Sequence, residues 1–246
     1  MNSSAPVALV TNVTGFCGQP AAEALAAEDF TVVCHDPDFA DPAAREAYAS
    51  AHPVLQPATA REPQALVGEV LAAHGRLDVL VNNDVYPAIR ARVEAAALDD
   101  LRASLESLVV APFALTAAAV PVMKERGQGK IIFVTSGTAL RGLSNYSMYC
   151  AARGSANALV VSLARELARH NIQVNAIAQN FVDNPSYFPE EIQANPKFQA
   201  RLQREVPLGR LVSAAEDAAF VAYLCSDAAS CFVGQVFPVC GGWIAR

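Results

Sequence analysis

Three side chains that could activate an alcohol stand at a regular spacing in the second half of the chain. Ser136 follows an apolar run, Tyr149 comes thirteen residues later, and Arg153 lies four residues beyond the tyrosine. Residues four apart share one face of a helix, so we expect Tyr149 and Arg153 to meet. A guanidinium favours the phenolate of a nearby tyrosine and, unlike an ammonium, does not become neutral. Such a phenolate can take a proton from a substrate hydroxyl that Ser136 holds in line.

The same residues also have an ordinary explanation, namely a packed tyrosine on a helix, an exposed arginine and a serine at a strand end. For Tyr149 and Arg153 alone, that explanation would be the better one. Ser136 at this distance, directly after a strand-like run, favours a catalytic array instead. A proton taken from an alcohol without a hydride acceptor leaves an alkoxide. If the neighbouring carbon bears a leaving group, the alkoxide closes a three-membered ring and expels an anion.

Strand and helix signals alternate along the chain, without an internal repeat or a linker. Short runs rich in Val, Ile and Leu are typical of strands buried on both faces of a parallel sheet. We predict strands at residues 7–11, 31–34, 53–55, 77–82, 130–135, 172–177 and 235–240. We predict helices at residues 19–28, 43–51, 62–73, 99–123, 149–170 and 214–225. The alternation indicates a single α/β domain over residues 1–246, a doubly wound parallel sheet with its site at the carboxyl ends of the strands.

Composition narrows the classes of partner. The chain has 246 residues, of which 53 % are hydrophobic, which is enough for a full core. A net charge of −6 argues against nucleic acid and against an anionic membrane surface. No uninterrupted apolar run reaches the roughly 18 residues that span a bilayer, and no basic signal segment precedes the first strand, so we expect a cytoplasmic protein. The six cysteines form no CxxC pair and no metal spacing, which predicts reduced thiols and no metal.

The helices predicted at 99–123 and 149–170 are long and rich in Ala, Leu and Val on more than one face. Two explanations are about equally good. Either both helices are deeply buried within the monomer, or their surplus apolar surface forms a subunit interface.

The turn after the first strand carries unusual residues. It reads T-N-V-T-G-F-C-G over residues 11–18. Together with the Ser–Tyr–Arg array, this turn resembles the short-chain dehydrogenases/reductases, which have T-G-x3-G-x-G here and Lys at the position of Arg153. Asn12 and Phe16 therefore stand where that family has glycine, and Gly18 matches it. A benzyl group at Phe16 would fill the space that a pyrophosphate needs.

Further departures from that pattern concern the same site. Asp84 stands in the N-N-A-G stretch where a cofactor would pass, and Gln179-Asn180 replace the Pro-Gly pair that normally meets a nicotinamide. Leu108 aligns with a catalytic helical Asn. Asp36 could hold a ribose hydroxyl, but we interpret it as a solvated loop residue. The resemblance implies a Rossmann-like fold of the short-chain dehydrogenase/reductase type that lacks a functional dinucleotide site.

With these features the chain resembles the halohydrin dehalogenases from Val7 to Gly242, and among them the B-type enzymes most. The resemblance rests on the S-x12-Y-x3-R array, T-N-V-x-x-F-x-G at 11–18, V-x-N-D at 81–84 and I-x-x-N-[FY] at 177–181. It implies conversion of vicinal haloalcohols to epoxide, halide and a proton without organic cofactor or metal. It also implies epoxide opening by halide, azide, cyanide or nitrite, and a homotetramer.

The resemblance also implies a role for each site residue. Ser136 would bind the substrate oxygen, Tyr149 would act as the base, and Arg153 would tune the tyrosine. Asp84 would lie behind Arg153 on the proton path. The halide would be surrounded by Phe16, Gln179, Asn180, Phe181 and Val182. Independently of the resemblance, the turn before the first helix could offer backbone N–H groups to a leaving anion. The substrate side would be lined by Thr138, Leu143, Tyr187 and Phe188.

Two functions of other kinds stay open on the sequence alone. The chain could be an NAD(P)-dependent short-chain oxidoreductase with an unusual cofactor loop, which titration with NADH would reveal. It could also be a non-catalytic sensor that binds a small ligand in a Rossmann-like cleft. Retention of the whole Ser–Tyr–Arg array argues against the sensor, because a binding module does not need an activated tyrosine.

Overall fold

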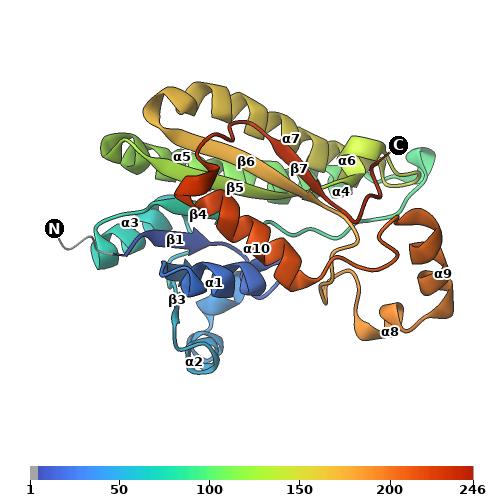
Figure 1. Cartoon of the computed structure of the whole chain (residues 1–246), viewed down its shortest axis with the longest axis horizontal. Helices are drawn as coiled ribbons and strands as arrows, with labels where there is room; N and C mark the ends of the chain where they lie inside the picture. Colours follow the sequence, from blue (N-terminus) through green and yellow to red (C-terminus); the bar gives the residue numbers. More distant parts are fainter. Residues whose placement is uncertain (1–4, 246) are drawn as a thin grey trace.

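One parallel sheet of seven strands runs through the protein, in the order β3-β2-β1-β4-β5-β6-β7 (Figure 1). The computed structural model describes residues 5–245. The strands are β1 (Val7–Val10), β2 (Thr31–Cys34), β3 (Leu55–Pro57), β4 (Val79–Asn82), β5 (Gly129–Ser136), β6 (Ile172–Gln179) and β7 (Val236–Val239). The chain order reverses between β1 and β4, and crevices at the carboxyl ends of such a switch point are the usual ligand sites of this architecture.

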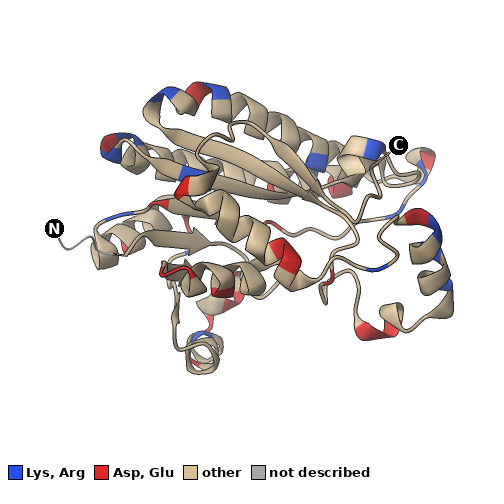
Figure 2. Ribbon diagram, viewed as in Figure 1, with Lys and Arg blue, Asp and Glu red and all other residues tan. Residues whose placement is uncertain are grey.

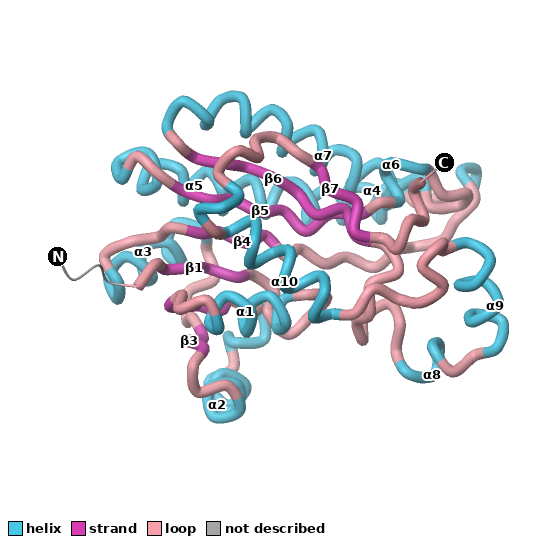
Figure 3. The backbone as a smooth tube through the Cα atoms, in the orientation of Figure 1, coloured by secondary structure: helices cyan, strands magenta, loops and turns pink. Residues whose placement is uncertain are grey.

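Helices cover both faces of the sheet (Figure 3). They are α1 (Gly18–Ala27), α2 (Pro42–Ala51), α3 (Pro63–His74), α4 (Leu98–Leu105), α5 (Ala111–Arg126), α6 (Thr138–Arg141), α7 (Ser147–Leu167), α8 (Glu190–Gln193), α9 (Pro196–Glu205) and α10 (Ala214–Cys225). One apolar core lies between the sheet and helices α1 and α10, and a second lies between the sheet and helices α3, α5 and α7. The fold predicted from the alternation of strands and helices, an α/β parallel sheet of Rossmann-like type, is confirmed.

Three parts of the chain differ from the prediction, and one of them is the short helix α6, which was not predicted. Residues 53 and 54 form a turn, closed by the Leu55 N–H to the His52 carbonyl at 2.9 Å, so β3 begins two residues late. The helices α8 and α9 were not predicted at all, because their segment has few apolar residues. Its helix signals are instead local ones, namely Asn195 accepting from the Lys197 N–H, and Pro196 in the first turn.

The long helix predicted at 99–123 is a continuous helical stretch from Leu98 to Arg126 with a π-helical turn between α4 and α5. By length and composition alone it could cross a membrane, since an 18-residue window has a mean hydropathy of 1.8. It instead packs on the sheet through Leu115, Ala119 and Met123, whereas Val110 and Phe113 are about half exposed. The helix is therefore buried along one stripe and carries apolar surface outside it, and the homotetramer stays a prediction.

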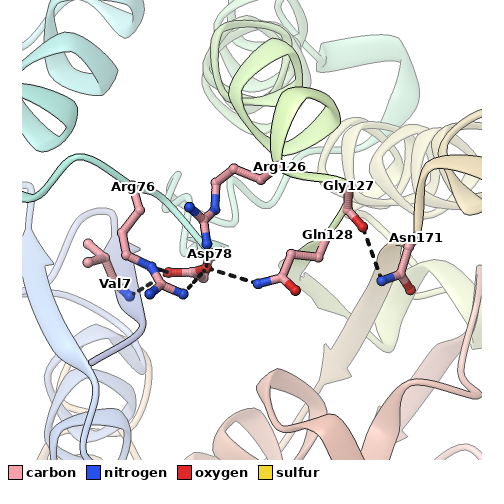
Figure 4. Close-up of polar contacts among 7 residues, drawn as sticks. All are labelled: Val7, Arg76, Asp78, Arg126, Gly127, Gln128 and Asn171. Atoms are coloured by element: carbon pink, nitrogen blue, oxygen red, sulfur yellow. Dashed lines mark hydrogen bonds and ion pairs between the residues drawn. The ribbon is translucent and has the colours of Figure 1, made fainter. Parts of the chain in front are cut away.

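At the amino ends of the strands, opposite the predicted site, one carboxylate joins three segments (Figure 4). Asp78 accepts from the Val7 N–H at 2.8 Å and from Arg76 Nε at 2.6 Å, and it also contacts Arg126 and Gln128. Burial works against its charge, but the bonds from Arg76 and from the backbone hold the pKa of Asp78 below its ordinary value. This network fixes the end of β4 against β1 and the α5–β5 turn, far from the carboxyl-end crevice.

Candidate active site

Tyr149 and Arg153 meet on the buried face of α7. Arg153 Nε donates a hydrogen bond to Tyr149 Oη at 3.1 Å. The other two nitrogens of the guanidinium donate to backbone carbonyls, Nη1 to Val134 and Nη2 to Asp84, both at 3.0 Å. Arg153 is 1 % exposed and Tyr149 is 6 % exposed. Because each of its nitrogens has a fixed acceptor, the guanidinium has one orientation, and that orientation is aimed at the phenol oxygen.

The surroundings of Arg153 keep it charged. Burial opposes the cation, but the neighbouring Tyr149, Tyr187 and Asp84 raise the pKa of Arg153 above its ordinary value. Its guanidinium carbon also lies 5.2 Å from the ring centroid of Tyr149 and 5.7 Å from that of Phe16. Aromatic faces attract a desolvated cation. Phe16, predicted only as part of a halide wall, thus also contacts the arginine of the array.

Ser136 ends β5 and pairs in register with Gln179 at the end of β6. Its hydroxyl lies 2.9 Å from Thr138 Oγ1 and 3.3 Å from the Gln179 carbonyl, and it accepts from the Thr138 N–H at 3.2 Å. These contacts fix the serine oxygen at the carboxyl edge of the sheet. Ser136 and Tyr149 line the same cavity.

Tyr187 lies closer to the tyrosine of the array than its predicted place on the substrate side implies. Its hydroxyl is 3.4 Å from Tyr149 Oη and donates to the Tyr86 carbonyl at 3.0 Å. Burial, and next the neighbouring Tyr149, raise the pKa of Tyr187 above its ordinary value. Tyr187 is therefore a neutral hydrogen-bonding partner at the site and not a second base.

A cavity of about 170 Å³ opens at this edge of the sheet. It brings together Ser136, Tyr149 and every residue predicted to surround the halide or the substrate, that is Phe16, Thr138, Leu143, Gln179, Asn180, Phe181, Val182, Tyr187 and Phe188. Four lining residues were not predicted: Ala88, Tyr146, Asn184 and Arg201. The Asn-Pro pair at 184–185 signals a turn, and Asn184 does bond the Tyr187 N–H, but no local signal brings α9 to the cavity.

Two aromatic residues at the cavity have left-handed backbone conformations. Phe16 has φ of 55° and Phe181 has φ of 52°, and Asn12 in the β1–α1 turn has φ of 46°. Side-chain-bearing residues rarely adopt this region, which costs about 1–3 kcal/mol each. At Gly18 a Cβ would lie 2.6 Å from Val13 Cα and 2.7 Å from the Asn12 carbonyl oxygen, so the turn requires glycine there. The β1–α1 turn thus has the backbone of a glycine-rich turn but carries side chains at two of its positions.

Behind the cavity wall, Gln179 contacts a carboxyl group that the sequence did not single out. Gln179 Nε2 donates to Asp217 Oδ2 on α10, and Asp217 is fully buried. Among residues 5–245, neither Asp217 Oδ1 nor Gln179 Oε1 has a hydrogen-bond partner. Burial raises the pKa of Asp217 to about 7 and, with Asp217 close by, also raises that of the Cys17 thiol. The sequence masks this role, because an aspartate in the first turn of a helix usually serves the helix dipole.

Asp84 approaches Arg153 through its main chain. Its carbonyl accepts from Nη2, whereas its carboxylate lies 3.5 Å from Asn12 Nδ2 and lines a second cavity with His35 and Arg61. Burial, opposed by the charge of Arg153, raises the pKa of Asp84 to about 7. A proton-path role for Asp84 stays a prediction.

The interpretation of Asp36 as a solvated loop residue is wrong. Asp36 is 5 % exposed, and its carboxylate accepts from the Thr14 N–H at 2.9 Å, from Thr14 Oγ1 at 2.7 Å and from the Asp38 N–H at 3.1 Å. It caps the turn after β2 and fixes the β1–α1 turn. In the described part of the chain, no cluster of three or more His, Cys, Asp or Glu side chains could hold a metal ion.

Comparison with known proteins places the chain in a family. The family model for enoyl-(acyl carrier protein) reductase matches residues 16–244. A (2S)-[(R)-hydroxy(phenyl)methyl]succinyl-CoA dehydrogenase subunit from Thauera aromatica is 32 % identical over 98 % of this chain and 95 % of its own length. The chain belongs to the short-chain dehydrogenase/reductase family. A solved structure from Burkholderia thailandensis that carries this family name is 27 % identical over 99 % of this chain and 94 % of its own, with a TM-score of 0.87.

Two other solved structures are more similar than that oxidoreductase. A dehalogenation enzyme is 44 % identical with a TM-score of 0.95, over 99 % of this chain and 100 % of its own. A halohydrin dehalogenase bound to ethyl (2S)-oxiran-2-ylacetate is 38 % identical with a TM-score of 0.93, over 96 % of both chains. The resemblance to halohydrin dehalogenases that the motifs indicated therefore extends to the whole fold, while the B-type assignment stays a prediction.

Proposed function

We propose that this protein is an enzyme that converts vicinal haloalcohols into epoxides, halide and a proton, and that also opens epoxides with halide, azide, cyanide or nitrite. The observation that carries the proposal is the 3.1 Å bond from buried Arg153 to Tyr149 Oη, at a cavity that Phe16 also lines. Similarity to a halohydrin dehalogenase structure supports it. A cytoplasmic homotetramer of B type is part of the same proposal.

The geometry suits removal of a proton from an alcohol. The substrate hydroxyl would lie between Ser136 and Tyr149, and Tyr149 would accept its proton as the general base. The substrate oxygen then attacks the neighbouring carbon, a C–O bond forms, and the carbon–halogen bond breaks with both electrons leaving on the halide. The proton passes from Tyr149 to solvent. Ser136 is suited to holding the oxygen because its own contacts fix it in one place.

The halide would leave toward the wall formed by Phe16, Phe181 and Val182. These side chains exclude water, and in a dry cavity the field of a fixed charge is strong. The guanidinium carbon of Arg153 lies 5.7 Å from the centroid of the Phe16 ring and would supply that field. The Phe16 N–H lies 3.4 Å from Ser186 Oγ, and the Gly18 N–H bonds the Gly15 carbonyl, so these two N–H groups already have partners.

Three contacts support the absence of a dinucleotide from this reaction. The ring of Phe16 packs edge-on against Tyr187, with centroids 5.4 Å apart. The family has glycine at position 16, so this ring occupies space that a glycine would leave open. The carboxylate of Asp36 is occupied by its own turn, so it is not free for a ribose hydroxyl. Every nitrogen of Arg153 already has a protein acceptor, whereas the family's lysine also holds a ribose.

The test is chloride release from 1,3-dichloro-2-propanol by purified protein without added nucleotide. We expect one proton and one epoxide for each chloride released, measured by pH-stat and gas chromatography, and no dependence on NAD(P)H. Absence of chloride release, together with NADH binding in the nanomolar to micromolar range, would favour an ordinary reductase. Absence of both activities would favour a sensor.

A further inference from the structure

The mouth of the cavity carries a single charged side chain. Among the described residues that line the cavity, Arg201 alone has a formal charge. It belongs to α9, which lies beyond the carboxyl ends of the strands (Figure 1). Its guanidinium carbon lies 5.4 Å from the ring centroid of Phe181, and its side chain is 44 % exposed. Arg201 therefore lies at the boundary between the apolar interior of the cavity and the solvent.

The charge of Arg201 is only partly compensated. Arg201 Nε pairs with Glu205 at 3.0 Å, but Arg204 pairs with the same carboxylate at 2.9 Å. Two guanidinium groups thus share one carboxylate, and the local charge is positive. Figure 2 shows blue basic and red acidic positions close together on α9, the helix labelled in Figure 1. Because the chain as a whole carries −6, the positive mouth is a local feature of the site.

The free edge of Arg201 has the geometry of a carboxylate receptor. Within residues 5–245, neither Nη atom of Arg201 has a hydrogen-bond partner. Contact with the face of Phe181 and the bond to Glu205 hold the planar group in place at the mouth. A planar guanidinium with free N–H groups binds a carboxylate through two parallel hydrogen bonds. Preorganisation lowers the entropy that such binding costs.

We infer that this enzyme acts on haloalcohols and epoxides that bear a carboxylate on the arm opposite the leaving group, which Arg201 binds at the mouth of the cavity. This inference rests on the proposed dehalogenase function. The halide end of such a substrate lies against the apolar wall and the acid end lies at Arg201. In 4-chloro-3-hydroxybutanoate, the C3 oxygen gives its proton to Tyr149 and attacks C4, and the C4–Cl bond breaks. The products are 3,4-epoxybutanoate, chloride and a proton.

The kinetic test compares three substrates in the full-length protein. 4-Chloro-3-hydroxybutanoate and its ethyl ester share the reacting carbons and differ in charge, and 1,3-dichloro-2-propanol is the neutral reference. We expect Arg201→Gln to lower kcat/KM for the carboxylate at least about tenfold and for the ester at most about twofold. Arg204→Gln is the matched control, since Arg204 pairs with the same Glu205 but does not line the cavity. It should change neither substrate more than about twofold.

Ionic strength and a conservative variant sharpen the result. Added salt should lower kcat/KM for the carboxylate in the wild type and not in Arg201→Gln, because salt screens a half-exposed charge pair. Arg201→Lys should recover part of the preference, since it keeps the charge and loses the fork. Equal losses for carboxylate and ester in Arg201→Gln would overturn the inference. The inference would also be overturned if Arg201→Gln changed only the azide concentration that epoxide opening requires. That result would mean that Arg201 attracts free anions and does not bind the substrate carboxylate.

A binding measurement separates this inference from the proposed function. Trp243, the one tryptophan of the chain, packs against the ring of Phe181 with centroids 5.9 Å apart, so its fluorescence reports on the cavity. 3-Hydroxybutanoate has no leaving group and binds without reacting. We expect its Kd to rise at least about tenfold in Arg201→Gln and to stay unchanged in Arg204→Gln. If no substrate releases chloride, the dehalogenase proposal fails, and an equal Kd in wild type and Arg201→Gln separately overturns the carboxylate site.

Discussion

The β5–α7 side and the β1–α1 side of the cavity both lie at the carboxyl ends of the sheet. They differ in which features of the short-chain dehydrogenase/reductase family they share. On the β5–α7 side, Ser136 and Arg153 donate hydrogen bonds to backbone carbonyls, and Arg153 also donates to Tyr149. On the β1–α1 side, the backbone keeps the left-handed conformations of a glycine-rich turn, yet Asn12 and Phe16 have filled it. The first side matches the family's Ser–Tyr array with Arg153 in place of lysine, whereas the second side differs from the family at two glycine positions.

The two sides also touch. The ring of Phe16 lies over the guanidinium of Arg153, so the side chain that fills the β1–α1 turn also forms part of the environment of the array. Hydride transfer and ring closure both begin with removal of an alcohol proton. The difference between them at this site is what lies opposite Tyr149, a nicotinamide or an apolar wall. The comparison therefore predicts that changes on the β5–α7 side alter the rate, whereas changes on the β1–α1 side alter anion binding.

The largest effect is expected from Tyr149→Phe. This substitution removes one oxygen and leaves a ring of the same size at a buried position on α7. Loss of a general base commonly lowers kcat by about 10²–10⁴-fold. Chloride release should fall by that amount while the thermal midpoint changes little. Activity within tenfold of the wild type would show that Tyr149 is not the base.

Asp217→Asn should change stability in a way that depends on pH. Because burial raises the pKa of Asp217 to about 7, the folded protein holds this proton more tightly than the unfolded chain, where the pKa is near 4. The stabilisation from the neutral carboxyl is complete below that unfolded value and is lost as pH rises through about 7. Asn stays neutral at both pH values. The free energy of unfolding of Asp217→Asn should therefore exceed that of the wild type by at most about 4 kcal/mol at pH 8.5, and by far less at pH 4.5.

Urea unfolding at the two pH values measures this difference. Asp99→Asn is the matched control, because Asp99 is exposed on α4 and forms a surface ion pair with Arg102. Such pairs contribute about 0–1 kcal/mol. The same stability difference at pH 4.5 and 8.5 for Asp217→Asn would mean that the carboxyl is not a titrating buried group. If the amide keeps the contact with Gln179, halide inhibition should change at most a few-fold.

Arg153→Lys restores the family's usual residue, yet we expect at least about a tenfold loss of kcat. The guanidinium holds Tyr149, Val134 and Asp84 at once, and a compact ammonium cannot reach three acceptors in those directions. A buried lysine can also lose its proton, which would remove the charge beside Tyr149. The pH–rate profile of the remaining activity should therefore be shifted to higher pH than that of the wild type. A pH–rate profile that overlays the wild type would show that any cation suffices.

Local patterns predicted the β5–α7 side well and the rest of the cavity less well. The spacing of Tyr149 and Arg153 is a property of one helix, and the end of β5 follows from an apolar run, so neither needs the tertiary fold. Arg201 reaches the cavity, and Asp217 reaches Gln179 behind its wall, through contacts between segments far apart in the chain. The local sequence of both residues is that of an ordinary helix. Phe16 could be placed at the site from its position in the turn, but its contact with Arg153 depends on packing between opposite sides of the crevice.

Phe16→Gly gives the smallest expected effect and tests the β1–α1 side directly. With φ of 55°, residue 16 suits glycine, so the change removes the ring without straining the turn. Losing the dry wall should raise the chloride inhibition constant about threefold to tenfold. Asn12→Gly is the control, because it relaxes the other left-handed residue of the turn and leaves the cavity lining intact. No NADH oxidation should appear, since Asp36 and Arg153 keep their present partners. Hydride transfer in Phe16→Gly would mean that a single ring is all that separates this site from a reductase.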